Sequence, residues 1–168
     1  MEPGEDHEEG TPTKEEDVMK KIGEYTVRGR IPIAAESNDP IKIQLFDGRF
    51  DTGFRITKFR VAGVAMGDGN GDCIAAKLVT DPSATPGGDW QFDDNSEIAW
   101  SMCSYAMNGT LPFGTNEIID KDNMIIEDLY IYVNTFGEGG MNYLIEMEKY
   151  DITDWQGALS MVRNKSQA

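Results

Sequence analysis

Residues 124–152 read "MIIEDLYIYVNTFGEGGMNYLIEMEKYDI", and this stretch decides the fold class of the chain. Two apolar runs, at 124–136 and 141–152, are separated by the glycine-rich link "GEGG". Runs of this length that are rich in β-branched and aromatic residues are typical of strands. Glycine supplies the backbone angles that a short chain reversal needs. The stretch therefore predicts a β-hairpin, and it is the strongest hairpin signal in the sequence.

An edge strand is predicted near the N-terminus. Segment 24–34, "EYTVRGRIPIA", alternates apolar and polar residues with period two, as a half-buried strand does. Pro32 has no backbone N–H to donate, which restricts such a strand to the edge of a sheet or ends it. The face opposite the apolar residues carries Thr26, Arg28 and Arg30.

The longest early strand, at residues 54–65, has an irregular apolar pattern. Its phase slips between Ile56 and Phe59, which predicts a β-bulge or burial of both faces. With this segment the chain contains seven or eight predicted strands, separated by turn residues. Strands spaced roughly ten residues apart are typical of sandwiches and jelly rolls. The sequence therefore predicts an all-β protein with a β-sandwich or jelly-roll-like domain.

The N-terminal segment differs from the strands in composition. Residues 1–17 contain eight acidic residues against Lys14, a net charge of −7 in a chain of net charge −15. The segment has too few apolar residues to fold alone. We therefore assign residues 1–22 to an extended acidic arm, with one or two helical turns expected at 15–22. An acidic arm repels phosphate, so we expect no nucleic-acid partner.

The C-terminal residues change from a strand pattern to a helix pattern. Thr153 and Gln156 have the spacing of a capping box, and the apolar residues that follow fall on one helical face. We therefore assign residues 23–152 to the β-sandwich domain and residues 153–168 to a short C-terminal α-helix and tail.

Targeting signals are not expected in this sequence. The N-terminus lacks the basic and apolar segments of a signal peptide, and no apolar run is long enough to cross a membrane. We therefore expect no membrane partner. Cys73 and Cys103 both lie in apolar, strand-like contexts, which favours core packing over a disulfide.

The loop "MGDGNGDC", residues 66–73, has the residue types of a cation site. Its candidate metal ligands are Asp68, Asn70 and Asp72. They match the first three ligand positions of a calcium loop. The glycine required at the sixth position is Cys73, however, and the glutamate required at the twelfth is Val79. We therefore interpret the loop as a tight turn between strands 54–65 and 73–80, with the three residues as weak calcium candidates.

Catalytic residues are scarce. The single histidine, His7, lies in the acidic arm, so no serine or cysteine has a structured histidine base. The two cysteines do not have the spacing of a zinc site. A carboxylate pair that acts on a glycan could come from Asp93, Asp94 and Glu97, although acidic surface loops are the default in so acidic a chain. We expect no enzymatic activity and no cofactor.

Two features suggest an interaction surface. A local basic stripe is expected from Arg28 and Arg30 on one strand and from Arg55, Lys58 and Arg60 on another. It is either a solvated face with internally paired charges or a dock for the acidic arm of an adjacent subunit. Tyr130 and Tyr132 lie on the strand face opposite Leu129, Ile131 and Val133. They form either part of a second packed layer or an exposed aromatic strip that another protein covers.

Three stretches of the chain resemble a known group of proteins. They are "LFDGRFDTGFRITKFRV" (45–61), "DDNSEIAWSM" (93–102) and "YDITDWQGALSMVRNKSQA" (150–168). Together they resemble small β-rich structural proteins of the virions of marine tailed bacteriophages. The resemblance covers about a third of the chain and does not extend to residues 1–17 or 66–73.

The resemblance implies a non-enzymatic virion component. We expect a capsid decoration (cement) protein that stabilises the shell through subunit contacts, with a tail or neck component as the nearest alternative. The implied partners are the major capsid protein or other virion proteins, together with further copies of this chain in a homo-oligomer. The implied location is the virion, after synthesis in the host cytoplasm.

A calcium-assisted glycan-binding β-sandwich is the alternative from a different functional class. It requires an exposed aromatic platform at Trp90, Trp100 or the two tyrosines. It also requires a cation at Asp68 and Asp72.

Overall fold

The computed structural model describes residues 19–32, 39–64, 72–82, 89–105, 114–136 and 140–152. These residues form strands and no helix. In chain order the strands are β1 (Lys20–Pro32), β2 (Ile41–Ile43), β3 (Thr52–Gly63), β4 (Asp72–Val79), β5 (Glu97–Tyr105), β6 (Gly114–Ile119), β7 (Leu129–Phe136) and β8 (Gly140–Asp151). The C-terminal helix expected at 153–168 and the arm up to residue 18 lie outside the described residues.

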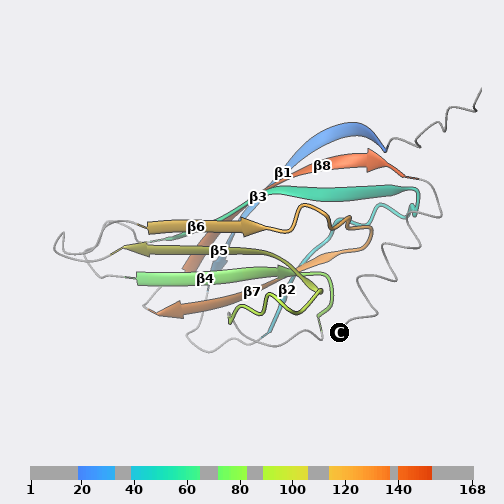
Figure 1. Ribbon diagram of the computed structural model, residues 1–168. Helices are drawn as coiled ribbons and strands as arrows, with labels where there is room; N and C mark the ends of the chain where they lie inside the picture. The colour runs from blue at the N-terminus through green and yellow to red at the C-terminus, as the bar shows by residue number, and fades with distance from the viewer. Residues whose placement is uncertain are drawn as a thin grey trace, which may run out of the picture.

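The strands form two antiparallel sheets (Figure 1). The smaller sheet has the order β1-β8-β3, and the larger has the order β2-β7-β4-β5-β6. β3 of the smaller sheet packs against β4, β5 and β6 of the larger one. The main core lies between the sheets, and side chains from both contribute fully buried members such as Phe59, Ile145 and Leu129. The expected all-β class is therefore confirmed, with two antiparallel sheets as in a β-sandwich.

The hairpin predicted from residues 124–152 is wrong. β7 lies in the five-stranded sheet between β2 and β4, whereas β8 lies in the three-stranded sheet between β1 and β3. Each strand is thus flanked on both edges by strands of its own sheet, so β7 and β8 are not paired with each other. The "GEGG" link therefore joins the two sheets. The turn expected at 66–73 lies largely outside the described residues. Its flanking strands β3 and β4 belong to different sheets, so they do not form a hairpin pair.

β1 is the outer strand of the three-stranded sheet and ends at Pro32, as its sequence predicted. It starts earlier than expected, however, at Lys20, which lies opposite Asp151 of β8. Residues 20–22 therefore belong to the sheet and neither to the acidic arm nor to a helical turn. Backbone pairing with β8 overrides the weak local helix preference of this short segment.

The expected β-bulge is present in β3. The register against β8 shifts between Ile56 and Lys58, so Thr57 is the additional residue, and its side chain is exposed. Ile56 and Phe59 are only 2% and 0% exposed, although they are three positions apart on one strand. The extra residue restores the inward phase, so both side chains enter the same core.

A carboxylate joins the two sheets at the outer edge of β3. Glu117 of β6 accepts a hydrogen bond from the backbone N–H of Phe59 (3.0 Å) through Oε1. Its Oε2 accepts one from Nε of Arg60 (3.1 Å). Among the described strands, none is hydrogen-bonded to β3 at Phe59 on this side, so the carboxylate serves as the acceptor for that backbone N–H.

We expect Glu117→Ala to destabilise the fold by about 1–3 kcal/mol, because the Phe59 N–H then loses its acceptor. Glu117→Gln retains a carbonyl oxygen for that N–H and should cost clearly less. Urea unfolding of the two variants beside the wild type measures both effects. Equal stability of all three proteins would contradict the role assigned to this carboxylate.

Candidate functional site

Three arginines meet on the outer face of the three-stranded sheet, which faces away from the main core. Arg28 and Arg30 come from β1, and Arg60 comes from β3. In the register, Leu144 of β8 lies between Arg28 and Arg60, and Asn142 lies opposite Arg30. Because alternate residues of a strand face the same side, these side chains all project outward. The period-two pattern thus correctly placed the two arginines of β1 on one face.

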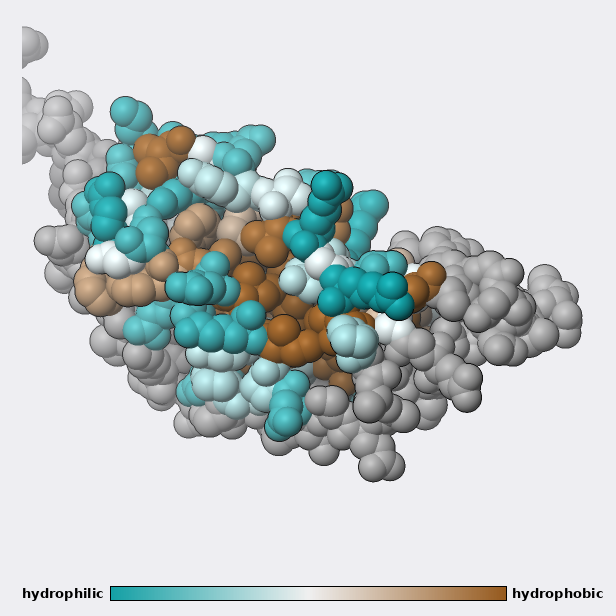
Figure 2. All heavy atoms as spheres, turned by 180° about the vertical axis from the view of Figure 1, so that it is seen from behind, coloured by the Kyte–Doolittle hydropathy of each residue, from teal (hydrophilic) through white to brown (hydrophobic). Residues whose placement is uncertain are grey.

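The arginines border an open groove with a volume of about 740 Å³. We call it the arginine groove and define it by Arg28, Arg30, Arg60, Ala62, Asn142 and Leu144. Figure 2 shows the molecule from the side opposite to Figure 1, and apolar residues gather there between hydrophilic ones. Ala62 and Leu144 provide apolar surface within the groove, and the guanidinium groups provide positive charge. This combination suits a ligand that is acidic and partly apolar.

The positive charge of the groove is largely uncompensated by the residues that the structure describes. Neither Arg28 nor Arg30 forms an ion pair with any residue that the structure describes. Arg60 contacts Glu117 through Nε, and its side chain remains 66% exposed. In a chain of net charge −15, a group of available guanidinium groups is a local exception.

The charges at the other end of this face are paired. Lys58 forms an ion pair with Glu146 (2.7 Å), and Lys21 forms one with Glu148 (2.6 Å). The hydrogen bond from Lys21, followed by that from Tyr150, lowers the pKa of Glu148 below its usual value. This part of the face matches the alternative of internally paired charges, whereas the arginine groove does not.

Arg55 does not join the other three arginines. It lies opposite Glu148 in the register, beyond Lys58 along β3. Its guanidinium carbon is 5.2 Å from the centre of the Tyr150 ring. The predicted basic stripe is therefore divided. Arg55 packs on an aromatic ring, Lys58 pairs with Glu146, and the other three members border the groove.

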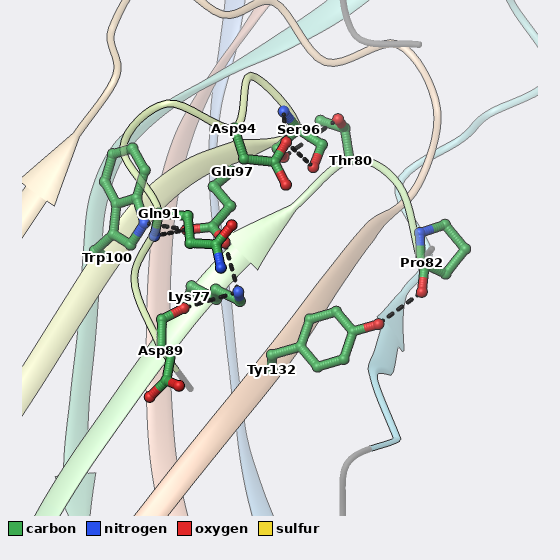
Figure 3. A network of polar contacts seen from close by, with 10 residues as sticks. All are labelled: Lys77, Thr80, Pro82, Asp89, Gln91, Asp94, Ser96, Glu97, Trp100 and Tyr132. Carbon is green, nitrogen blue, oxygen red and sulfur yellow. Dashed lines mark hydrogen bonds and ion pairs between the residues drawn. The ribbon is translucent and has the colours of Figure 1, made fainter. Parts of the chain in front are cut away.

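Tyr132 lies on the outer face of the five-stranded sheet, and its hydroxyl points to Pro82 of the segment after β4 (Figure 3). Tyr132 is 2% exposed, and its hydroxyl donates a hydrogen bond to the carbonyl of Pro82 (2.6 Å). Tyr130 is partly buried against Tyr132 and Val79. Of the two alternatives, Tyr132 fits the packed layer, so it offers no exposed surface to a partner.

A buried ion pair between Lys77 and Glu97 lies beside Tyr132 (Figure 3). Nζ of Lys77 is 2.5 Å from Oε1 of Glu97, and both side chains are 0% exposed. The ammonium also donates to the backbone carbonyl of Asp89 (2.9 Å). Oε2 of Glu97 accepts from the backbone N–H of Gln91 (2.9 Å) and from Nε1 of Trp100 (2.7 Å). The network ties the segment at 89–97 to the sheet beneath it.

Sequence reasoning missed this ion pair. Glu97 was assigned by default to an acidic surface loop, and Lys77 was counted only as part of a strand. A signal existed, since Lys77 interrupts the apolar run "CIAAKLV" and Glu97 directly precedes the apolar "IAW". A charged residue within a buried strand requires a buried partner. The sequence did not indicate which carboxylate would be that partner.

A second pocket, of about 470 Å³, lies beside β7. Its lining combines aromatic and acidic residues, among them Phe46, Phe50, Tyr130, Glu127 and Asp128. Phe50 is 52% exposed, and its ring centre is 5.2 Å from that of Phe46. An aromatic surface beside carboxylates resembles the usual chemistry of sugar recognition.

Asp128 is engaged by protein groups at the edge of this pocket. Oδ1 accepts hydrogen bonds from the N–H groups of Leu45 (2.9 Å) and Phe46 (3.0 Å), and Oδ2 is 2.7 Å from Nζ of Lys42. Burial by itself raises the pKa of Asp128, but Lys42 and the two amides outweigh it, and the pKa lies below its usual value. The carboxylate therefore remains ionised and fastens the residues after β2 to the start of β7.

The calcium candidates receive no support from the described residues. Asp68 and Asn70 lie outside them, and Asp72 is described only through its place in β4. Within the described ranges, no three histidine, cysteine or carboxylate residues lie close enough to hold a metal ion. Cys73 and Cys103 are free cysteines. Nor does the described part of the chain contain a helix long and apolar enough to cross a membrane.

Comparison of the chain with protein-family models gives no match, and a search of curated proteins finds no similar one. The functional interpretation therefore rests on the residues and surfaces described above.

Proposed function

We propose that this protein is a non-enzymatic structural component of a bacteriophage virion, most specifically a capsid decoration (cement) protein. The resemblance of residues 45–61, 93–102 and 150–168 to virion proteins supports the proposal. So does the strand order, although a fold alone does not determine function. The arginine groove is the observation that carries it, because an exposed surface whose charges lack partners among the described residues suits a lasting contact with another protein.

The strand order supports assignment of the domain as a jelly roll. In that fold the chain doubles back so that strand pairs 1–8, 2–7, 3–6 and 4–5 are neighbours. β1–β8, β2–β7 and β4–β5 are hydrogen-bonded neighbours in the present structure. The remaining pair, β3 and β6, is in contact through Glu117. Viral capsid domains and lectins are among the proteins that use this fold.

The proposed partners are the major capsid protein and further copies of this chain. A decoration protein must hold its position through many weak contacts, which add up when copies cluster on a shell. The acidic residues at 1–17 and the arginine groove are complementary in charge and suit such clustering. A tail or neck position on the particle uses the same surfaces with a different partner.

A particle-binding assay tests the proposal. Full-length protein and a variant that lacks residues 1–17 are mixed with shells stripped of the native protein and are pelleted over a salt series. We expect saturable binding of the full-length chain, and weaker binding of the variant. The deletion removes no residue of the described core, because every residue of that core lies at position 19 or later. If neither form binds shells, the decoration role is wrong. Binding to isolated tails alone would select the tail alternative.

The glycan-binding alternative retains one favourable observation, the pocket beside Phe46, Phe50 and Tyr130. The platform that it required at Trp100 is absent, since that side chain is only 4% exposed. A calcium titration followed by thermal unfolding tests the rest of this alternative. A ligand that binds the folded state at one hundred times its Kd stabilises it by about 2.7 kcal/mol. An unchanged Tm at millimolar calcium would eliminate calcium-assisted binding.

A further inference from the structure

We propose that the arginine groove binds the acidic residues 1–17 of a second copy of this chain. This proposal deepens the proposed function and rests on it, because a shell holds copies close together and so strengthens a contact that free copies form less readily. Each copy donates its arm to the groove of a neighbour. It receives an arm either from that same neighbour or from a different copy.

The groove and the arm are complementary in charge. The groove presents Arg28 and Arg30 without ion-pair partners in the described residues, together with the exposed Arg60. The arm carries eight acidic residues against one lysine. Guanidinium groups bind carboxylates in a planar, two-pronged geometry, so closely spaced arginines can each engage one acidic side chain. The rest of the described surface offers no comparable group of arginines.

Apolar surface within the groove adds a second contribution. Ala62 lies opposite Asn142, and Leu144 lies between Arg28 and Arg60, so the charged groups surround a less polar centre. The arm contains Pro3 and Pro12, which favour extended backbone. An extended peptide can lay its carboxylates on the arginines while its backbone and proline rings cover Ala62 and Leu144.

The geometry favours an arm from a second copy over the chain's own arm. β1 begins at Lys20, whereas Arg28 and Arg30 lie eight and ten residues further along it, roughly 26–33 Å away. A chain bound to its own groove must reverse direction before Lys20, and Asp17 is the single residue at 13–19 of a type that favours turns.

The charges along a return path on the same sheet are already paired. Lys21 pairs with Glu24 and Glu148, and Lys58 pairs with Glu146. A returning arm therefore gains no ion pair there without breaking an existing one. A neighbouring copy can instead present its arm directly at the arginine end of the sheet.

A peptide-binding measurement tests the site. A fluorescent peptide of residues 1–17 is titrated with the full-length protein at low salt, and its anisotropy is followed. We expect saturable binding that weakens as salt increases. Arg28→Glu/Arg30→Glu should weaken binding at least tenfold, and Arg28→Ala/Arg30→Ala should weaken it by less. Lys20→Glu/Lys121→Glu changes net charge equally at exposed sites outside the groove and should bind nearly as the wild type does. Equal losses in both glutamate variants would overturn the site.

A mixing experiment tests the exchange between copies. One variant lacks residues 1–17 but retains the groove, and the other retains the arm but carries Arg28→Glu/Arg30→Glu. We expect each variant alone to sediment as a monomer, and an equimolar mixture to form a dimer that dissociates in salt. A mixture that remains monomeric at concentrations where the wild type associates would overturn the exchange. Neither experiment contains a viral particle, so failure here and failure of the particle-binding assay are independent results.

Discussion

Lys77→Met is expected to destabilise the protein by about 3–5 kcal/mol, the cost of removing one partner from a buried ion pair. The side chains of Lys77 and Glu97 are completely buried, so Glu97 would be left as an uncompensated carboxylate among apolar neighbours. Its remaining protein donors, the N–H of Gln91 and Nε1 of Trp100, are neutral. Most of the cost is the penalty of the charge that stays buried. Urea unfolding monitored by tryptophan fluorescence measures it.

The double variant Lys77→Met/Glu97→Gln is the matched control. Glutamine removes the orphaned charge and still offers a carbonyl oxygen to Trp100 or Gln91. Replacing a buried ion pair by neutral residues of similar size is often close to neutral. We therefore expect the double variant to be clearly more stable than Lys77→Met alone. If Lys77→Met costs less than about 1 kcal/mol, water reaches the pair and the assigned burial is wrong.

Deletion of Thr57 is expected to abolish cooperative folding. Phe54 and Ile56 before the bulge, and Phe59 and Val61 after it, all face the core only because Thr57 shifts the phase. Without it, one pair or the other turns to the outer face. Each fully buried Phe or Ile contributes roughly 1.5–3 kcal/mol, so the loss of a pair approaches the total stability of a small domain.

Thr57→Ala is the control for that deletion, because the side chain is exposed while its backbone remains in place. We expect a change within about 0.5 kcal/mol. Thermal unfolding followed by circular dichroism distinguishes the two variants. A cooperative transition near the wild-type Tm in the deletion variant would show that β3 can re-register, contrary to the proposed role of the bulge.

The sequence predicted those features that depend on neighbouring residues within one strand. Pro32 marked an edge strand, because the missing donor is a local property, and β1 is indeed an edge strand. The phase slip between Ile56 and Phe59 marked the bulge, because inward and outward positions alternate with period two. The same alternation placed Arg28 and Arg30 on one face of β1.

Features that join distant residues were not predictable in this way. The hairpin signal at 124–152 correctly indicated two strands but not their neighbours, since a glycine-rich link permits both a tight reversal and a crossing between sheets. Arg60 joined Arg28 and Arg30 because β8 lies between β1 and β3. Arg55, on the same strand as Arg60, was left apart from them.

The sequence by itself therefore determined the all-β class, the inward and outward faces of β1, its edge position and the bulge in β3. Only the tertiary structure decided the two strand orders, the burial of Lys77 with Glu97, and the meeting of three arginines in one groove. The physical reason is that side-chain alternation is a property of each strand alone. Strand order, in contrast, depends on which long-range pairings bury the most apolar surface while satisfying the backbone hydrogen bonds and the buried charges.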